Sequence, residues 1–406
     1  MSLNSRIFLG AFLGLILGSI LRYYAPNTAL NEAILYSAGL VGSLFIGLLK
    51  MVLIPLVFCS IVVGVANLRA HQQMHRVWQI TLLCFACTTT LAIMLGLGAA
   101  HVFDTGKGLS LHLFEANLQG FEASQLSTGE FLQSLVKNVF VNPFTALSQG
   151  NILAVVVFAL FIGVALAVKG EAYPKLHALF NESFALCMQL VGWIMQLAPY
   201  GIMALLLKLV LSENSALLGT LAQFMAVVTG TTLFHGLVTL PLFLWLFTRV
   251  SPLQFWRGAR PALLTAFATS SSAATLPITL NCLQQDLKVS PKVSGFVVPL
   301  GAQLNMDGTA LYEAAAALFV ANLVGLDLSL GQQLIICVTV MLASIGAPGI
   351  PSAGMVTMVM VLQSVGLPAE AVAILLPIDR LLDTVRTAVN VEGDMVTSLI
   401  VDKHSA

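Results

Sequence analysis

Six polar residues near the C-terminus interrupt one of the most apolar parts of this 406-residue sequence. They follow one another mainly at steps of three or four residues, and they are Asp379, Asp383, Arg386, Thr387, Asn390 and Asp394. On an α-helix with about 3.6 residues per turn, this spacing places them on one face. Charged side chains at bilayer depth are costly unless they are paired or face a cavity. The stripe therefore predicts a binding and ion-coupling site, with charge pairs that only lock helices together as the alternative.

Two residues of the stripe have chemistry suited to an amino acid that carries an extra carboxylate. Arg386 presents a planar fork of donors that grips a carboxylate through two parallel hydrogen bonds. Asp383, one turn earlier, is an acceptor for an ammonium group. A salt bridge between these two residues is the alternative, and both arrangements can hold, in loaded and empty states. Arg380 is expected to pair with Asp379 or to reach a backbone carbonyl.

A second polar group, residues 305 to 309 (NMDGT), lies in the middle of a long apolar run. Its glycine loosens a helix, and unwinding there would expose carbonyl oxygens beside the Asp307 carboxylate. Oxygen ligands of this kind suit a small hard cation such as Na⁺, and Asn390 with Asp394 supplies a second set. A kinked packing site, with Asp307 paired to another helix, is the alternative.

Two further titratable residues lie inside apolar helices. Glu313 follows Asp307 by six residues, within the run YEAAAALFV. A carboxyl group buried there without a partner would favour its neutral form and serve as a proton carrier; snorkelling toward the membrane interface is the alternative. His235 is expected to be a hydrogen-bonded helix residue and not a metal ligand.

The composition sets the class of protein in which these residues act. With 58% hydrophobic and 9% charged residues and a mean hydropathy of +0.93, the chain has too little polar surface for a soluble domain. It is predicted to be an all-α polytopic membrane protein. The net charge is zero and the basic residues are scattered, so no nucleic-acid partner is expected. No GxSxG or GxGD motif is present, which argues against an intramembrane hydrolase, and the chain is not expected to be an enzyme.

Apolar runs long enough to cross a bilayer predict eight transmembrane helices. They lie near residues 7 to 24, 37 to 67, 77 to 103, 130 to 169, 174 to 211, 217 to 248, 292 to 325 and 367 to 400. Several are longer than a straight span requires, so they must tilt, kink or break, and Asn142 with Pro143 marks a break in the fourth. The first run is expected to be a retained helix that follows a cytoplasmic N-terminus.

Two segments outside these spans, residues 253 to 288 and 331 to 366, are interrupted by TSSSAA (269 to 274) and SIGAPGIPSAG (344 to 354). Each half has about 12 to 16 residues, or roughly 18 to 24 Å of helix, which is too short to cross. We expect two re-entrant helical hairpins with buried tips, entering from opposite sides. Each break precedes a polar helix centre at a similar distance, a pattern typical of the inverted repeats of secondary transporters.

The distribution of charge predicts the orientation. An N-terminus in the cytoplasm places the basic loops inside and the acidic loop 104 to 130 outside, as the positive-inside rule favours. The basic residues concerned are Arg69, Arg76, Lys169, Lys175, Arg249, Arg257, Arg260, Lys288 and Lys292.

Four motifs together resemble the dicarboxylate/amino acid:cation symporter family, which includes prokaryotic glutamate and aspartate transporters and the animal excitatory amino-acid transporters. The motifs are TSSSAATLP (269 to 277), VPLGAQLNMDGTALYE (from residue 298), ASIGAPGIPSAG (343 to 354) and DTVRTAVNVEGD (383 to 394). Ala273, in place of a fourth serine, and Ala347 and Ser352 depart from the pattern of some relatives.

The resemblance implies roles for residues at matching positions. The implied substrate contacts are Ser271, Ser272, Ile350, Gly354, Asp383, Arg386, Thr387 and Asn390. The implied Na⁺ ligands are Gly301, Asn305, Asn390 and Asp394 in one set, Thr88, Thr89, Asn305 and Asp307 in another, and backbone around Gln303, Ser344, Ile345 and Ala347 in a third. Glu313 matches the glutamate linked to proton coupling in the animal transporters.

The resemblance also implies a homotrimer with an elevator mechanism. Residues 1 to 67 and 130 to 211 would form the scaffold, and residues 77 to 103 and 217 to 400 the moving transport domain, with the second hairpin as the extracellular gate. Because both Asp383 and Arg386 are present, the expected function is symport of L-glutamate and L-aspartate with Na⁺ and H⁺ across the cell membrane, without a cofactor. K⁺ counter-transport stays open. The alternatives are coupling to protons alone, or transport of C4-dicarboxylates or neutral amino acids.

Overall fold

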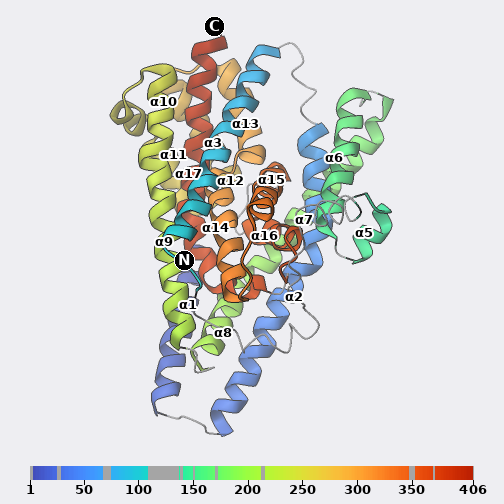
Figure 1. The fold of residues 1–406 in the computed structure, drawn as a ribbon. Helices are drawn as coiled ribbons and strands as arrows, with labels where there is room; N and C mark the ends of the chain where they lie inside the picture. The colour runs from blue at the N-terminus through green and yellow to red at the C-terminus, as the bar shows by residue number, and fades with distance from the viewer. Residues whose placement is uncertain are drawn as a thin grey trace.

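The computed structural model describes residues 3–24, 29–66, 75–107, 137, 140–149, 151–169, 172–211, 215–346, 353–368 and 371–405. This part of the chain is helical and contains no β-strand, which confirms the predicted all-α class (Figure 1). The helices are α1 (Leu3–Tyr24), α2 (Ala29–Ala66), α3 (His75–Val102), α5 (Pro143–Gln149), α6 (Ile152–Lys169), α7 (Pro174–Gln196), α8 (Ala198–Leu211), α9 (Ser215–Phe234), α10 (Leu240–Thr248), α11 (Pro252–Thr269), α12 (Ser272–Asn281), α13 (Pro291–Leu304), α14 (Asp307–Leu323), α15 (Leu330–Gly346), α16 (Ala353–Ser364) and α17 (Val372–Ser405). Two π-helical turns, η4 (His235–Thr239) and η5 (Cys282–Asp286), continue α9 and α12.

Five stretches of the described chain are long and apolar enough to cross a membrane. They are Ser5–Tyr24, Asn31–Leu48, Arg76–Val102, Pro174–Gln196 and Gly219–Thr248. Shorter apolar helices accompany them, including Ile54–Ala66 and Ala154–Lys169. The protein is therefore polytopic, as predicted, whereas the number of eight spans stays a prediction.

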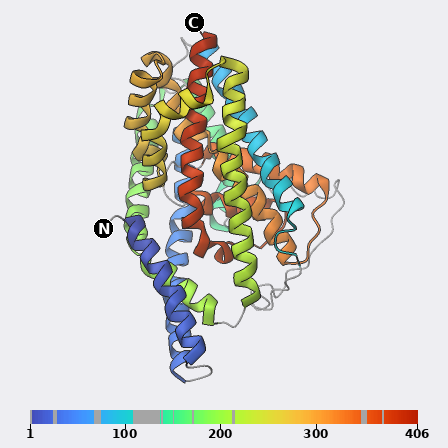
Figure 2. The ribbon, with the colours of Figure 1, turned by 90° about the vertical axis from the view of Figure 1, so that its left-hand side faces the viewer.

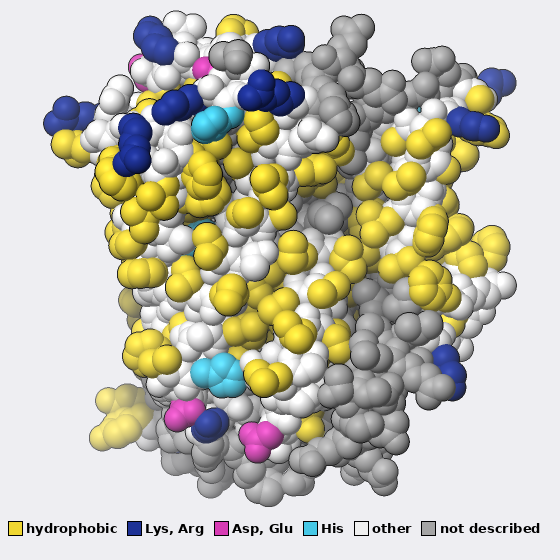
Figure 3. Space-filling view, turned by 45° about the horizontal axis from the view of Figure 1, so that its top comes forward, with side chains coloured by type: hydrophobic (Ala, Val, Ile, Leu, Met, Phe, Trp, Pro, Cys, Tyr) yellow, Lys and Arg dark blue, Asp and Glu magenta, His cyan; other side chains and the backbone are white. Residues whose placement is uncertain are grey.

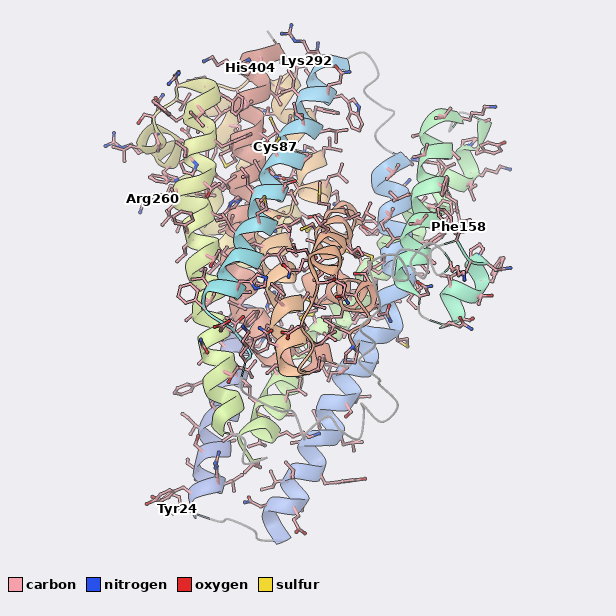
Figure 4. The ribbon with its side chains drawn as sticks, viewed as in Figure 1. Tyr24, Cys87, Phe158, Arg260, Lys292 and His404 are labelled. Atoms are coloured by element: carbon pink, nitrogen blue, oxygen red, sulfur yellow. The ribbon has the colours of Figure 1, made fainter. Side chains whose placement is uncertain are left out.

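The surface supports a membrane location. Hydrophobic side chains cover most of the middle of the face in Figure 3, and Lys and Arg gather along its upper end (Figure 3). Lys292 and His404 lie at that end of the molecule, Arg260 lies somewhat below them, and Tyr24 lies at the opposite end (Figure 4). An apolar belt between polar ends is the arrangement that a bilayer requires.

The helices pack into two groups. In the first, α1 lies along α8, and α2 packs against α6, α7 and α8; the rings of Phe58 and Phe158 join α2 to α6 with centroids 6.0 Å apart. In the second group, α17 is the central helix and packs against α3, α9, α10, α11, α13 and α14. Figure 2 shows α17, in red, descending from the C-terminal end of the molecule between helices of this group (Figure 2). The polar stripe of α17 is consequently enclosed by protein.

Two of the predicted breaks are present at the expected residues. α11 ends at Thr269, Ser270 takes a left-handed conformation with φ 51°, and α12 begins at Ser272. The Ser271 hydroxyl accepts a hydrogen bond from the Ala274 N–H at 3.2 Å, so the serine run ends one helix and caps the next. In the seventh predicted span, Asn305 and Met306 leave the helical conformation between α13 and α14.

The second hairpin consists of α15, which ends at Gly346, and α16, which begins at Ala353. The residues between them, which include the expected site residues Ala347 and Ile350, lie outside the described residues. Pro143 begins α5, as the predicted break in the fourth span requires, and the start of that span, residues 130 to 136, also lies outside the described residues.

Candidate functional site

Four charged side chains of α17 form a buried ion-pair network. Nη2 of Arg386 lies 2.7 Å from Oδ1 of Asp379 and 3.1 Å from Oδ1 of Asp383. Nη1 of Arg380 lies 2.9 Å from Oδ2 of Asp383. The salt bridge between Asp383 and Arg386 was one of the predicted arrangements. The pairing of Arg380 with Asp383 was not predicted. Asp379, which was expected as a possible partner of Arg380, is the nearest partner of Arg386.

The network balances its own charge in a place that water does not reach. Arg386 is only 1% exposed, and its three partners are similarly buried. Two guanidinium groups face two carboxylates, so the sum of their charges is zero. Removing one member of such a buried set leaves an uncompensated charge, which typically costs about 3 to 5 kcal/mol. The four side chains are thus neutral as a set, but Nε and Nη1 of Arg386 make no hydrogen bond within the described residues. A ligand carboxylate could bind these nitrogens, although it would compete with the two carboxylates already paired with Nη2.

Two glycines bring other helices against Arg386. A Cβ on Gly308 would lie 2.8 Å from the Arg386 Cα, so only glycine lets the start of α14 approach α17 this closely. A Cβ on Gly354 would lie 2.9 Å from Cγ2 of Thr309 and 3.5 Å from Nη1 of Arg386. The Arg386 guanidinium also stacks 4.1 Å from the ring centroid of Tyr312. The first turn of α16 therefore lies directly against the arginine expected to bind a carboxylate.

A carboxylate on α14 gathers side chains from two distant helices. Asp307 is completely buried, and its Oδ1 accepts hydrogen bonds from the hydroxyl groups of Thr89 at 2.7 Å and Thr88 at 3.3 Å, both on α3. Its Oδ2 makes no hydrogen bond within the described residues and lies 3.6 Å from Nε2 of His235. Neither ring nitrogen of His235 is hydrogen-bonded there, so the expectation of a hydrogen-bonded helix histidine is wrong.

A second oxygen-rich group lies where α17 passes the break between α13 and α14. The Asn305 amide donates a hydrogen bond to Oδ1 of Asp394 at 3.1 Å, and its own Oδ1 is unsatisfied within the described residues. Asn390 accepts a hydrogen bond from the Gly308 N–H at 2.8 Å. A Cβ on Gly301 would collide with the Asp394 carboxylate. Buried, unsatisfied oxygens beside carboxylates are the ligands that a small hard cation prefers.

Glu313 has a partner on the second hairpin. It is 1% exposed, which rules out the alternative of snorkelling toward the interface. The hydroxyl of Thr357, on α16, donates a hydrogen bond to the Glu313 carboxylate, so the expectation of a buried carboxyl without a partner is also wrong. Because α14 carries Glu313 and α16 carries Thr357, this hydrogen bond joins the two helices.

The remaining predicted residues are placed as follows. Ser271, Ser272, Thr387 and Ser344 are buried, and the Ser344 hydroxyl has no hydrogen bond within the described residues. The helix that begins at Ser272, α12, packs against α17. Gln303 is partly exposed on α13, and Ile345 belongs to the end of α15.

One buried acid lies outside every predicted site. Glu392 is on α17, and its Oε1 accepts a hydrogen bond from Nε1 of Trp256 on α11 at 3.1 Å. A Cβ on Gly236, in the π-helical turn η4, would lie 2.9 Å from its Oε2. In the sequence, Glu392 is a charged residue within an apolar helix, but it does not lie on the same helix face as the polar stripe. The helical period therefore did not identify it as a site residue.

The sequence is similar to known transporters over nearly its whole length. The pattern of the Sodium:dicarboxylate symporter family matches residues 3–404. The chain is 34% identical to excitatory amino acid transporter 3 of Bos taurus, an alignment that covers 97% of this chain and 83% of that protein. It is 34% identical to an excitatory amino acid transporter of Caenorhabditis elegans (96% and 86% covered). It is 36% identical to neutral amino acid transporter B(0) of Bos taurus (90% and 73% covered).

Proposed function

Because the chain belongs to the sodium:dicarboxylate symporter family, we propose that it carries L-glutamate and L-aspartate across the membrane together with Na⁺. The observation that carries this proposal is the buried pair of Asp383 and Arg386, 3.1 Å apart beside Gly354. A relative named for excitatory amino acids and one named for neutral amino acids are both similar to the chain. The choice between these substrate classes therefore depends on the site residues.

Arg386 and Asp383 favour a substrate with an amino group and an extra carboxylate. The guanidinium would turn from Asp383 to the side-chain carboxylate of the substrate, and this movement frees Oδ1 of Asp383 for the ammonium group. The substrate thus replaces one internal ion pair with two. A neutral amino acid has no side-chain carboxylate to bind Arg386, and a dicarboxylate has no ammonium group to bind Asp383. Either ligand would therefore leave one of these two buried charged side chains without a ligand partner, which weakens binding.

The other proposed substrate contacts complete the enclosure. Ser271 and Ser272 at the end of the first hairpin, together with Gly354 and Ile350 of the second, would bind the α-carboxylate through backbone N–H groups and hydroxyls. Thr387 and Asn390 continue the same face of α17. The hydrogen bond from the Gly308 N–H to Asn390 connects this substrate face to the cation ligands.

Na⁺ would bind at the two oxygen-rich groups. Thr88, Thr89, Asn305 and Asp307 form one proposed site, and Gly301, Asn305, Asn390 and Asp394 form another; Gln303, Ser344, Ile345 and Ala347 belong to a third. In the first two sites the cation would neutralise a buried carboxylate, Asp307 or Asp394, that has no cationic partner at hydrogen-bond distance within the described residues. Asn390 belongs to both the proposed substrate contacts and the proposed cation ligands, so ordering it for one ligand favours the other, which is the basis of coupling.

We also assign a proton to Glu313. Protonation removes the charge of Glu313. The ionised carboxylate can only accept a hydrogen bond from Thr357, whereas the protonated carboxyl can also donate one, and this changes the contact between α14 and α16. H⁺ would thereby be coupled to movement of the second hairpin. An outward K⁺ gradient that stimulates uptake would add K⁺ counter-transport to the cycle.

The proposed movement is an elevator in a homotrimer. Helices α1, α2 and α6 to α8, within residues 1 to 67 and 130 to 211, would form the fixed scaffold. Residues 77 to 103 and 217 to 400 would move as one body that contains the site and the two re-entrant hairpins. The separate packing of α1, α2, α6, α7 and α8 supports this division. The N-terminus would lie in the cytoplasm of a cell whose plasma or inner membrane contains the protein.

The test is uptake of labelled L-aspartate and L-glutamate into proteoliposomes, with and without an inward Na⁺ gradient. We expect the gradient to stimulate uptake of both substrates. Competition by succinate and by L-alanine, measured at two pH values, assigns the substrate class. Uptake that is independent of Na⁺, or that succinate or L-alanine inhibits as strongly as L-aspartate, would refute the proposed function.

A further inference from the structure

Asp383 has a guanidinium on each of its two oxygens. Arg386 contacts Oδ1 at 3.1 Å and Arg380 contacts Oδ2 at 2.9 Å. The two arginines differ in their other contacts, because Arg386 also pairs with Asp379 and stacks on Tyr312. Arg386 is therefore positioned by several groups, and its bond to Asp383 is the longer of its two ion pairs. Both arginines are three residues from Asp383 on the same helix, so the difference between them lies in these other contacts.

We infer that Arg380 is a positioning residue that holds the Asp383 carboxylate with Oδ1 directed to the ammonium group of the substrate. This inference rests on the proposed binding of an amino acid at Asp383. While Arg380 occupies Oδ2 of Asp383, Arg386 contacts Oδ1 only. When Arg386 turns away to the substrate carboxylate, Oδ1 becomes available to the ammonium group. Without Arg380, the carboxylate can rotate and offer both oxygens to Arg386 in a bidentate pair, the stronger arrangement of these two groups.

The inference has a consequence for selectivity. A bidentate pair between Asp383 and Arg386 would compete with both the ammonium group and the side-chain carboxylate of an amino acid. A dicarboxylate without an amino group does not bind Asp383. The orientation of the Asp383 carboxylate therefore affects the binding of such a ligand far less. Arg380 would thus favour amino acids over simple dicarboxylates while touching neither.

The test compares L-aspartate with succinate, which has the same two carboxylates and no amino group. Dissociation constants are measured in Na⁺ on the purified full-length protein, by calorimetry for L-aspartate and by competition for succinate. We expect Arg380→Gln to weaken L-aspartate roughly tenfold to hundredfold relative to succinate, the range for loss of one hydrogen bond to a charged group. Arg380→Lys keeps the charge and should restore part of the loss.

Thr384→Val is the matched control. Thr384 is buried one residue from Asp383, and its hydroxyl donates only to the Leu381 carbonyl at 2.8 Å among the contacts in the structure. The valine variant removes a polar group from the same turn and should not change the ratio of the two constants. Equal weakening of L-aspartate and succinate by Arg380→Gln, or an unchanged or tighter L-aspartate constant, overturns the inference. If the unmodified protein binds no acidic amino acid in Na⁺, the proposed function fails instead.

Discussion

The substitution Gly301→Ala tests the cation site most directly. The added Cβ would approach both Oδ1 and Cγ of Asp394 more closely than real Cβ atoms come to any neighbour, and it would lie 3.1 Å from Cζ of Phe85. The carboxylate must therefore move. Its movement strains the hydrogen bond from the Asn305 amide, now 3.1 Å long, and takes an oxygen away from the proposed Na⁺ ligands.

The expected magnitude follows from the cost of overpacking. Adding a methyl group to a filled site typically costs about 1 to 3 kcal/mol, and about 1.4 kcal/mol corresponds to a tenfold change in affinity. We expect Na⁺ to bind roughly tenfold or more weakly, and L-aspartate to bind weakly at low Na⁺ but regain its affinity at high Na⁺. The assay is calorimetric titration of L-aspartate at a series of Na⁺ concentrations.

Gly295→Ala is the matched control, because Gly295 lies in the same helix and a Cβ there meets nothing within 4 Å. Its Na⁺ dependence should equal that of the unmodified protein. If Gly301→Ala leaves the Na⁺ dependence unchanged, or if high Na⁺ fails to restore L-aspartate binding, then the Asp394 carboxylate is not a Na⁺ ligand.

Three further predictions concern other contacts. Arg386→Cys should weaken L-aspartate and L-glutamate far more than neutral amino acids in competition assays, and equal loss of both classes would remove its assigned role. Glu313→Gln cannot exchange a proton, so uptake, which should rise toward acidic pH in the unmodified protein, should become independent of pH; an unchanged pH profile in proteoliposomes contradicts the proton assignment. Trp256→Phe keeps an aromatic ring but leaves Glu392 without its donor, and should lower the free energy of unfolding by about 1 to 3 kcal/mol. An unchanged melting temperature would show that this hydrogen bond does not stabilise the fold.

Several features of the site could be predicted because they depend on local backbone preferences. The 3.6-residue period placed Asp379, Asp383, Arg386, Asn390 and Asp394 on one face of a helix, and α17 carries them all, buried. The serine run and the NMDGT segment mark helix breaks at the residues where the structure has them. Such signals require only the residue types and their spacing, since a helix face and a helix end are set within a few turns.

The partners of these residues depended on the tertiary structure. The helical period assigns a side chain to a face but does not say which neighbouring helix meets it, so Thr357 as the donor to Glu313 and His235 beside Asp307 could not be foreseen. Even within α17, the spacing allows Arg380 to reach either Asp379 or Asp383. The sequence by itself determined an all-helical membrane protein with a charged stripe and two broken segments. Only the packing of α3, α13, α14 and α16 around α17 decided which oxygens remain for a cation and which charges are already paired, because these depend on contacts between residues far apart in the chain.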